Sequence, residues 1–442
     1  MKPVFALRQD AREIFNAALT AADAAKAVSR HLRVDGEVID IDGRLYSLGS
    51  YRNIFVIGAG KASAQMCGAL AELIGDRLYG GIIIVKYGYA VPMKKITIIE
   101  AGHPIPDENG LRATEQLVGL LRQTTGEDLV INLISGGGSA LLCSPADGVS
   151  FHEKQEITRR LLRCGAPIGE INAIRKHISK VKGGRVARLA YPSTLISLIL
   201  SDVVGDSISA IASGPTAPDP STFFDCQGIL DRYQLRTEKS GSIARLIGKG
   251  SAGEIEETPK PGDPIFNNVV NAVIGSNRVA VIAAKEQAET LGYSVKVIDD
   301  LAEGETTELA VAHAAIVKEI YHSGTSRRPA CVISGGEATV TLHGDGLGGR
   351  NQEFALATAL EIDGLDGIVA LIGGTDGTDG PTEAAGGIVD GDTVRRGKTH
   401  GLDARDYLSR NDSYHFLRAT DDLLVTGPTF TNVMDLRLFI IG

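Results

Sequence analysis

Short glycine-rich segments with interleaved Ser, Thr, Lys, Asp or Arg residues recur along this sequence, mostly just after an apolar run. They are GAGKAS (58–63), SGGGS (135–139), SGGE (334–337), GDGLGGRNQE (344–353), GGTDGTDGP (373–381) and TGPTFTNV (426–433). Glycine has no Cβ atom, so the backbone N–H groups of such loops can converge on an anion. One such loop would indicate only a turn, whereas the repeated pattern predicts a phosphate-binding site.

The first two loops supply most of the predicted ligand contacts, namely Gly58, Gly60, Ser135, Gly136, Gly137, Gly138 and Ser139. Lys61 stands beside the first loop at the expected start of a helix, where a cation suits a phosphate or a carboxylate. Its alternative role is that of a solvated lysine at a helix start. The serines are expected to donate to phosphate oxygens, or otherwise to cap the following helix.

Carboxylates at the ends of apolar runs form a second candidate set. Asp202, Glu337 and Asp376 are the candidate metal ligands, because Mg²⁺ prefers oxygen ligands together with water and nucleotide phosphates. Asp202 is also a candidate to take the proton from a substrate hydroxyl. Asp345 and Asp379 lie in similar loops. A lone Asp more often caps a helix or forms an Asx-turn, so the shared placement beside glycine loops carries the prediction.

Basic residues and histidines complete the set. Arg350 follows the glycines of 346–349, and a guanidinium held there can clamp a carboxylate or phosphoryl group in a bidentate manner. Its alternative role is a surface ion pair. His103 and His177 are of residue types that serve catalysis, but a structural role is the expectation for both. The basic segment RKHISKVKGGR (175–185) either steers an anionic substrate or forms a solvated helix face.

Known nucleotide and nucleophile fingerprints are missing from these loops. A dinucleotide-binding loop reads G-x-G-x-x-[G/A], and this chain has Ser63 at the last position. The next apolar run ends in Lys86, where that fold needs an acidic residue for the ribose. The sequence contains neither GxxxxGK[ST] nor GxSxG. An NAD site is therefore disfavoured, and neither a Walker loop nor a serine nucleophile elbow is predicted.

Alternating apolar runs and amphipathic stretches must position these loops. A helix is predicted over 8–31, and strands over 53–58, 80–86, 96–102, 129–137 and 194–202, with helices over 61–74, 108–123, 152–165 and 170–189. A second series starts near 267 and runs to 428. The pattern predicts two α/β layer-sandwich domains, Rossmann-like and doubly wound, over 1–245 and 246–442. The second half of the polar segment 236–265 is interpreted as the boundary region.

Composition excludes several classes of protein. With 442 residues, 43% hydrophobic and 22% charged, the chain is expected to fold into at least two soluble domains. A net charge of −9 without a basic stripe argues against nucleic-acid binding. Five scattered cysteines, no secretory signal and no long apolar span predict a cytoplasmic protein with reduced thiols, away from the membrane. Homo-oligomerisation is left open.

Eight ordered motifs resemble those of the class II glycerate kinases, whose C-terminal portion is the MOFRL domain and whose older members were called hydroxypyruvate reductases. They comprise the loops above except SGGE (334–337), together with EAGHPIPDENG, INAIRKHISKVKGGR and SDVVGDSISAIASGPT. The resemblance covers nearly the whole chain, from about residue 8 to the end. It implies two α/β domains with the active site in the cleft between them. It also implies transfer of the ATP γ-phosphoryl group to D-glycerate, most commonly at the 2-hydroxyl.

The resemblance also assigns roles to residues. Lys61 and Arg350 match the family's catalytic basic residues, one from each domain, and Asp202, Glu337, Asp376 and Asn432 match its other polar cleft residues. Three positions depart from the family pattern. Phe430 and Met434 stand where TGPTGTNVND is expected, and Tyr89 stands where KYGH is expected. These departures affect the expected substrate range more than the expected reaction.

Two rival functions remain from other classes. The first is an NAD(P)H-dependent hydroxypyruvate reductase, which Ser63 and Lys86 weaken. The second is a non-catalytic protein that binds sugar phosphates, which would not need the carboxylate set. The sequence does not distinguish phosphorylation of the 2-hydroxyl from that of the 3-hydroxyl.

Overall fold

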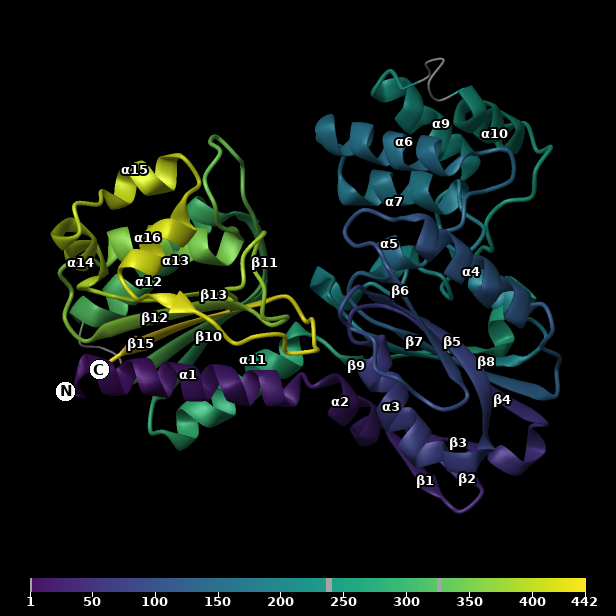
Figure 1. Ribbon diagram of the computed structural model, residues 1–442, viewed down its shortest axis with the longest axis horizontal. Helices are drawn as coiled ribbons and strands as arrows, with labels where there is room; N and C mark the ends of the chain where they lie inside the picture. Colours follow the sequence, from purple (N-terminus) through teal and green to yellow (C-terminus); the bar gives the residue numbers. More distant parts are fainter. Residues whose placement is uncertain (1, 236–240, 324–327) are drawn as a thin grey trace. The chain divides into compact units, whose positions relative to one another are not determined.

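The computed structural model describes residues 2–235, 241–323 and 328–442, and its chain divides into two compact units (Figure 1). The central unit comprises Ala24–Ile274, and the terminal unit comprises Met1–Asp23 together with Gly275–Gly442. Each unit contains a six-stranded sheet with helices packed against it. The predicted α/β class with two domains is therefore confirmed. No helix among the described residues is long and apolar enough to cross a membrane.

The expected domain limits differ from the observed units at both ends. The predicted boundary at 245/246 shifts to Ile274/Gly275, because β9 (Val269–Gly275) adds a sixth strand to the central sheet. The predicted helix over 8–31 is two helices, α1 (Val4–Ala21) and α2 (Ala24–His31). α1 packs on elements of the terminal unit, so the N-terminus belongs there. Residues 236–240 of the predicted boundary segment lie outside the described residues.

The central sheet has the order β6-β5-β4-β7-β8-β9, and the pairs from β6 to β8 are parallel. Its strands are β4 (Asn53–Ala59), β5 (Leu78–Lys86), β6 (Ile96–Ala101), β7 (Asp128–Ile134), β8 (Thr194–Leu200) and β9. Every residue of β7 is buried. Its uninterrupted apolar sequence fits this position, because a central parallel strand has both faces covered by other elements.

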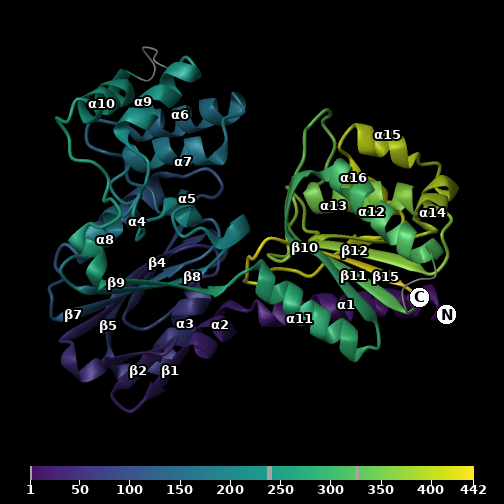
Figure 2. The same ribbon diagram turned by 180° about the vertical axis from the view of Figure 1, so that it is seen from behind.

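Helices cover the central sheet, and more of them form a separate helical layer beyond it (Figure 2). They are α3 (Ser63–Ile74), α4 (Glu108–Leu121), α5 (Gly138–Leu141), α6 (Phe151–Arg163), α7 (Ile168–His177), α8 (Arg185–Ala190), α9 (Phe223–Arg232) and α10 (Gly241–Ser251). α6, α7, α9 and α10 share an apolar core of their own. A small antiparallel sheet of β1 (Leu32–Asp35), β2 (Val38–Ile41) and β3 (Arg44–Ser47) completes the unit.

The terminal sheet is mixed, which differs from the predicted doubly wound parallel arrangement. Its order is β10-β11-β15-β12-β13-β14, with β10 (Ser294–Glu305), β11 (Ala330–Thr339), β12 (Ile368–Gly374), β13 (Gly386–Asp390), β14 (Leu423–Leu424) and β15 (Asp435–Ile441). Only β10 and β11 pair in parallel, and β15 runs antiparallel between β11 and β12. β15 is fully buried, so the last strand of the chain lies at the centre of the unit.

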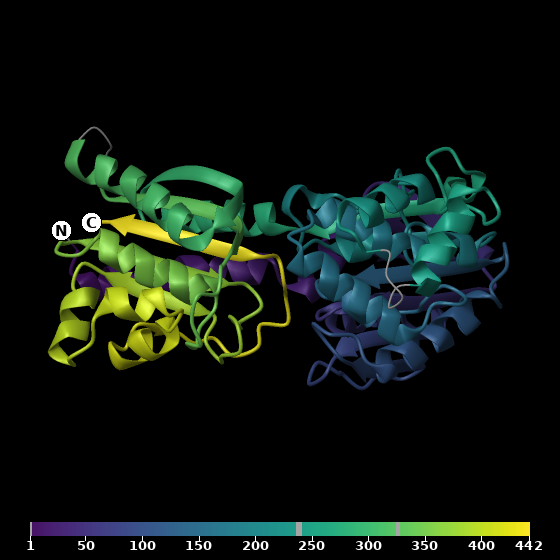
Figure 3. The same cartoon turned by 90° about the horizontal axis from the view of Figure 1, so that it is seen from above.

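Helices lie on both faces of the terminal sheet. α1 and α11 (Asn277–Thr290) lie on one face, and α12 (Thr306–Ser323), α13 (Arg350–Glu361) and α16 (Ser413–Ala419) on the other (Figure 1). The second layer also contains α14 (Thr393–Thr399) and α15 (Ala404–Ser409), and in the view from above β15 is visible between its helices (Figure 3). α13 is almost wholly buried, and this fixes the position of Arg350 at its first residue.

Candidate functional site

The strand order of the central sheet brings the two predicted phosphate loops together. After β4 the chain builds outward through β5 and β6, then returns to place β7 on the other side of β4. Ligands of open α/β sheets bind at such a switch point, beyond the carboxyl ends of the strands. GAGKAS follows β4 and SGGGS follows β7, so both loops lie at this switch point. Asp202 follows the adjacent parallel strand β8 at the same edge.

The glycines of GAGKAS allow the two loops to touch. A Cβ atom on Gly58 would lie 2.3 Å from the Leu133 carbonyl oxygen, and one on Gly60 would lie 2.1 Å from Ser135 Oγ. The backbone N–H of Lys61 donates to the Gly136 carbonyl oxygen at 2.8 Å. These glycines are therefore needed for close packing of the loops, and their predicted contact with a nucleotide stays a prediction.

The serines of SGGGS have different environments. Ser135 is buried, and its Oγ accepts from Ala62 N at 3.0 Å and lies 3.1 Å from Ser63 Oγ. This inward contact makes a direct bond from Ser135 to a ligand less favourable than predicted. Ser139 is partly exposed, and its Oγ lies 3.0 Å from Ser213 Oγ. Of the two serines, Ser139 is the better placed to meet a ligand.

His103 lies against the same loop. Gly137 has φ +85°, and a Cβ atom there would lie 2.9 Å from His103 Cδ2 and 3.6 Å from Lys61 Cγ. Sequence reasoning favoured a structural role for His103, and its proline-rich surroundings gave no sign of this contact. The fold thus places Lys61, His103 and Ser139 around one short loop.

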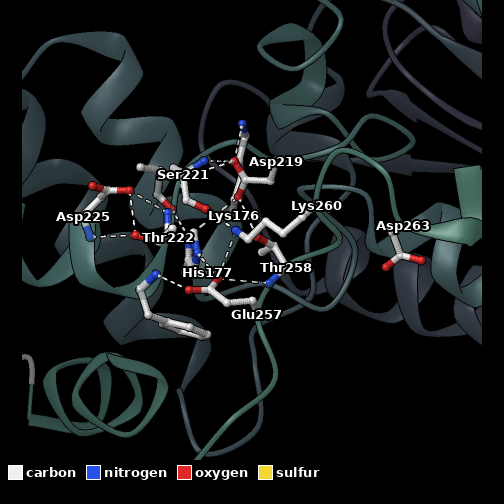
Figure 4. A network of polar contacts seen from close by, with 12 residues as sticks. Lys176, His177, Asp219, Ser221, Thr222, Asp225, Glu257, Thr258, Lys260 and Asp263 are labelled. Carbon is white, nitrogen blue, oxygen red and sulfur yellow. Dashed lines mark hydrogen bonds and ion pairs between the residues drawn. The ribbon is translucent and has the colours of Figure 1, made fainter. Parts of the chain in front are cut away.

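The basic segment 175–185 is not a solvated helix face. The predicted helix over 170–189 is broken into α7 and α8, and Lys176, His177 and Lys182 are all buried. Figure 4 shows the polar network that surrounds the first two of these residues. Lys176 Nζ lies 3.1 Å from Asp219 Oδ1, and His177 Nε2 lies 3.1 Å from Glu257 Oε2.

This network holds the chain segments around α7 together. Asp219 also accepts from Ser221 N and Oγ and from Thr258 Oγ1, at 2.7 to 3.1 Å. Burial lowers the pKa of His177, and the Ala173 carbonyl and the Asp219 and Glu257 carboxylates oppose that shift. The contacts give His177 a structural role, which was the expectation from sequence.

Asp219→Asn should destabilise the chain strongly. The substitution keeps the side-chain shape but leaves Lys176 as a buried ammonium without its carboxylate partner. Breaking a buried ion pair in this way costs roughly 3 kcal/mol or more in the free energy of unfolding. Urea denaturation measures the loss. Asp147→Asn is the matched control, because Asp147 pairs with Lys180 at the surface and should change stability by less than about 1 kcal/mol.

In the terminal unit, Arg350 is held between two carboxylates. Its Nε and Nη2 donate to the two oxygens of Asp435 at 2.7 and 2.9 Å, and its Nη1 lies 2.8 Å from Glu337 Oε1. Burial disfavours the charge of Arg350, but the carboxylates of Asp435 and Glu337 outweigh burial and raise its pKa. Asp435 is fully buried and was not among the predicted site residues. The guanidinium is therefore oriented by its bidentate contact with Asp435, which is the first residue of β15.

Asp379 forms the N-terminal cap of α13 from a distant loop. Gly349 at the N-cap has no side chain, and Asp379 accepts from the backbone N–H groups of Asn351 and Gln352 at 3.2 and 2.8 Å. Burial raises the pKa of Asp379 to about 6, although these hydrogen bonds lower it. The carboxylate thus has a structural task, which is to fix the turn that carries Arg350.

Comparison with known proteins assigns the family. Residues 10–248 match the family described as "Domain of unknown function (DUF4147)", and residues 330–435 match the MOFRL family. A Thermotoga maritima protein named D-glycerate 2-kinase is 42% identical over 390 residues, which are 88% of this chain and 90% of that protein. A Pyrococcus horikoshii protein named glycerate 2-kinase is 40% identical, over 98% of this chain and 97% of that protein. The chain belongs to the glycerate kinase family.

A solved structure from this glycerate kinase family has the same fold. The crystal structure of a glycerate kinase from Thermotoga maritima matches with a TM-score of 0.86 at 39% sequence identity, covering 99% of this chain and all of that chain. One further relative, from Agrobacterium vitis, is provisionally named hydroxypyruvate reductase and is 41% identical over 88% of this chain and 99% of that protein. The resemblance inferred from the motifs is confirmed.

Two of the three departures from the glycerate kinase pattern lie at backbone positions of one kind. Phe430 and Met434 have φ +56° and +68°, in the left-handed region that favours glycine and asparagine. This explains why the family pattern has Gly and Asn there. Asn432, a predicted site residue, lies between them and is half-buried. Thr375 Oγ1 receives the Val433 N–H at 2.9 Å, which ties this loop to the loop of Asp376.

The three candidate metal ligands of this glycerate kinase family member are divided between the units. Asp202 belongs to the central unit, and Glu337 and Asp376 belong to the terminal unit. Asp376 Oδ1 accepts from Thr378 N at 3.1 Å, as in an Asx-turn. Within the described ranges, no three or more His, Cys, Asp or Glu side chains are grouped so that they could hold a metal ion. A metal cage made of protein side chains alone is therefore not seen.

Proposed function

We propose that the chain catalyses the ATP-dependent phosphorylation of D-glycerate at its 2-hydroxyl, giving 2-phospho-D-glycerate and ADP. The observation that carries this proposal is the pair of glycine loops at the switch point of the central sheet, with Lys61 beside them. The names of the relatives at 40–42% identity support the same reaction. Phosphoryl transfer asks a protein chiefly for positioning and for neutralisation of charge, and these groups supply both.

The proposal gives each candidate residue a task. Lys61 and the SGGGS loop bind phosphate oxygens, and Arg350, aimed by Asp435, binds the glycerate carboxylate or the transferring phosphoryl group. Asp202 takes the proton of the attacking hydroxyl. The joint action of Lys61 and Arg350 on one substrate stays a prediction.

A divalent cation should be required for turnover. Mg²⁺ commonly binds through one or two carboxylates together with water and substrate phosphates, so the lack of a three-ligand group in the described residues fits a metal that binds with the nucleotide. Asp202, Glu337 and Asp376 are the residues proposed to contact it. Excess EDTA should abolish ADP formation from ATP and D-glycerate, and added Mg²⁺ should restore it. Full turnover in EDTA would contradict the metal requirement.

The product identifies the reaction. A phosphorus NMR spectrum of the mixture formed from D-glycerate and ATP should show 2-phosphoglycerate, and 3-phosphoglycerate would change the assigned hydroxyl.

The rival reductase has support in the name of the Agrobacterium vitis relative. Against it, the third position of the dinucleotide fingerprint is Ser63, whose Oγ donates to the Leu133 carbonyl oxygen, and β5 ends in Lys86. Loss of NADH absorbance at 340 nm with hydroxypyruvate would favour the reductase.

A further inference from the structure

The Lys182 side chain places a buried amino group directly beneath the SGGGS loop. It lies between α7 and α8 and is 1% exposed. Its Nζ donates to the carbonyl oxygens of Ser139 at 2.9 Å and Ala212 at 3.3 Å, and it lies 3.4 Å from Ser139 Oγ. Within the described residues, the hydrogen bonds of this amino group are thus with Ser139 and with the η4 turn (Ile211–Ser213).

Lys182 differs from its neighbours in having no counter-ion among the described residues. Lys176 pairs with Asp219 and Lys180 pairs with Asp147, but no carboxylate in the part of the chain that the structure describes forms an ion pair with Lys182. The cations of Lys154 and Arg175 lie near it; burial and these charges lower its pKa, and the Cys143 thiol opposes them. A buried charge is costly without an opposite one. The arrangement fits a site whose anion is supplied by a ligand.

The loop above Lys182 offers donors for such an anion. The backbone N–H groups of Gly136 and Gly137 donate to no other residue that the structure describes. Ser139 Oγ belongs to a chain of polar contacts that continues through Ser213 Oγ to Asn172 Oδ1, at 3.0 and 3.1 Å. Lys182 Nζ contacts Ser139 Oγ, the first group in this series of polar contacts, and so sets the orientation of the Ser139 hydroxyl.

We propose that Lys182 is the positioning residue and charge source for a nucleotide phosphate group bound at the SGGGS loop. This inference rests on the proposed kinase function and adds to it a residue that motif reasoning did not select as a site residue. A phosphate oxygen that accepts a hydrogen bond of ordinary length from Ser139 Oγ would lie within about 6 Å of Lys182 Nζ. At that separation in a poorly solvated site the attraction is substantial.

Calorimetric titration of two lysine variants with ATP and with adenosine tests the proposal. Lys182→Met keeps the length and removes the charge; Lys180→Met is the matched control, because Lys180 is two positions away and partly exposed. Lys182→Met should weaken ATP binding by roughly 10- to 100-fold. Adenosine binding should be unchanged, because adenosine has no phosphate, and Lys180→Met should bind both ligands like wild type. The melting temperature of Lys182→Met is measured alongside, because the substitution removes a buried charge and also the hydrogen-bond donor of the Ser139 and Ala212 carbonyl oxygens.

The outcomes separate this role from a structural one. A lower melting temperature with unchanged ATP affinity would make Lys182 a packing residue and overturn the proposal, as would an equal loss for adenosine. If Lys182→Met does not fold, Lys182→Gln keeps a donor for the carbonyl oxygens, and unchanged ATP affinity in that variant overturns the proposal. Binding is measured without glycerate. If Lys182→Met weakens ATP binding but the wild-type protein forms no phosphoglycerate, the proposed function is contradicted and the proposed role of Lys182 in phosphate binding stands.

Discussion

Lys61→Ala should lower kcat/KM for glycerate phosphorylation by roughly 10²-fold or more, as expected for loss of an electrostatic contact in the transition state. The side chain is 9% exposed, and its backbone N–H is held by the Gly136 carbonyl oxygen beside the SGGGS loop. The fold should persist, because the backbone contacts between the two loops do not involve the lysine side chain. Steady-state kinetics measure kcat/KM, and a thermal melt tests whether the fold persists.

The control for this variant is Lys249→Ala, which removes the same charge from an exposed position near the end of α10. It should leave kcat/KM unchanged. Near-wild-type kinetics for Lys61→Ala would contradict a catalytic role and leave Lys61 a structural residue beside the start of α3.

Arg350→Lys should reduce kcat/KM by about 10-fold or more while ATP still binds, because the planar bidentate fork is lost although the charge stays. The structure adds a second expectation. Asp435 is fully buried and receives two of the guanidinium hydrogen bonds, so the variant should also lose about 1–3 kcal/mol of stability. Asn351 Nδ2 still donates to Asp435 Oδ1 at 2.9 Å and limits this loss.

Arg395→Lys is the matched control, because this exposed arginine pairs with Asp392 one helical turn away. The double variant Lys61→Ala/Arg350→Lys tests joint action. If both side chains act on one transition state, its loss should be smaller than the product of the two single losses. A strictly multiplicative loss would contradict the shared site, and unchanged kinetics for Arg350→Lys would return this residue to a structural ion pair.

Some of the architecture follows from the sequence alone. The apolar runs of β4, β5, β6, β7 and β8 identify the central sheet, because a strand buried on both faces must be apolar throughout. The glycine loops mark the carboxyl ends of these strands because only residues without a Cβ atom fit where the loops touch. The order of these motifs is sufficient to indicate the glycerate kinase family.

Tertiary structure decided what depends on residues far apart in the chain. The last strand could not be assigned to the middle of the terminal sheet, because strand order is set by packing rather than by local pattern. The partners of Arg350 and of the α13 N-terminus could not be predicted from the sequence either. Asp435 lies 85 residues from Arg350, and Asp379 lies 27 residues from Gln352, from whose N–H it accepts a hydrogen bond. The same holds for Lys182. Its segment has the composition of a solvated basic helix. Only the fold shows that this lysine is buried without a carboxylate partner among the described residues, beneath a loop in which the Gly136 and Gly137 N–H groups donate to no described residue.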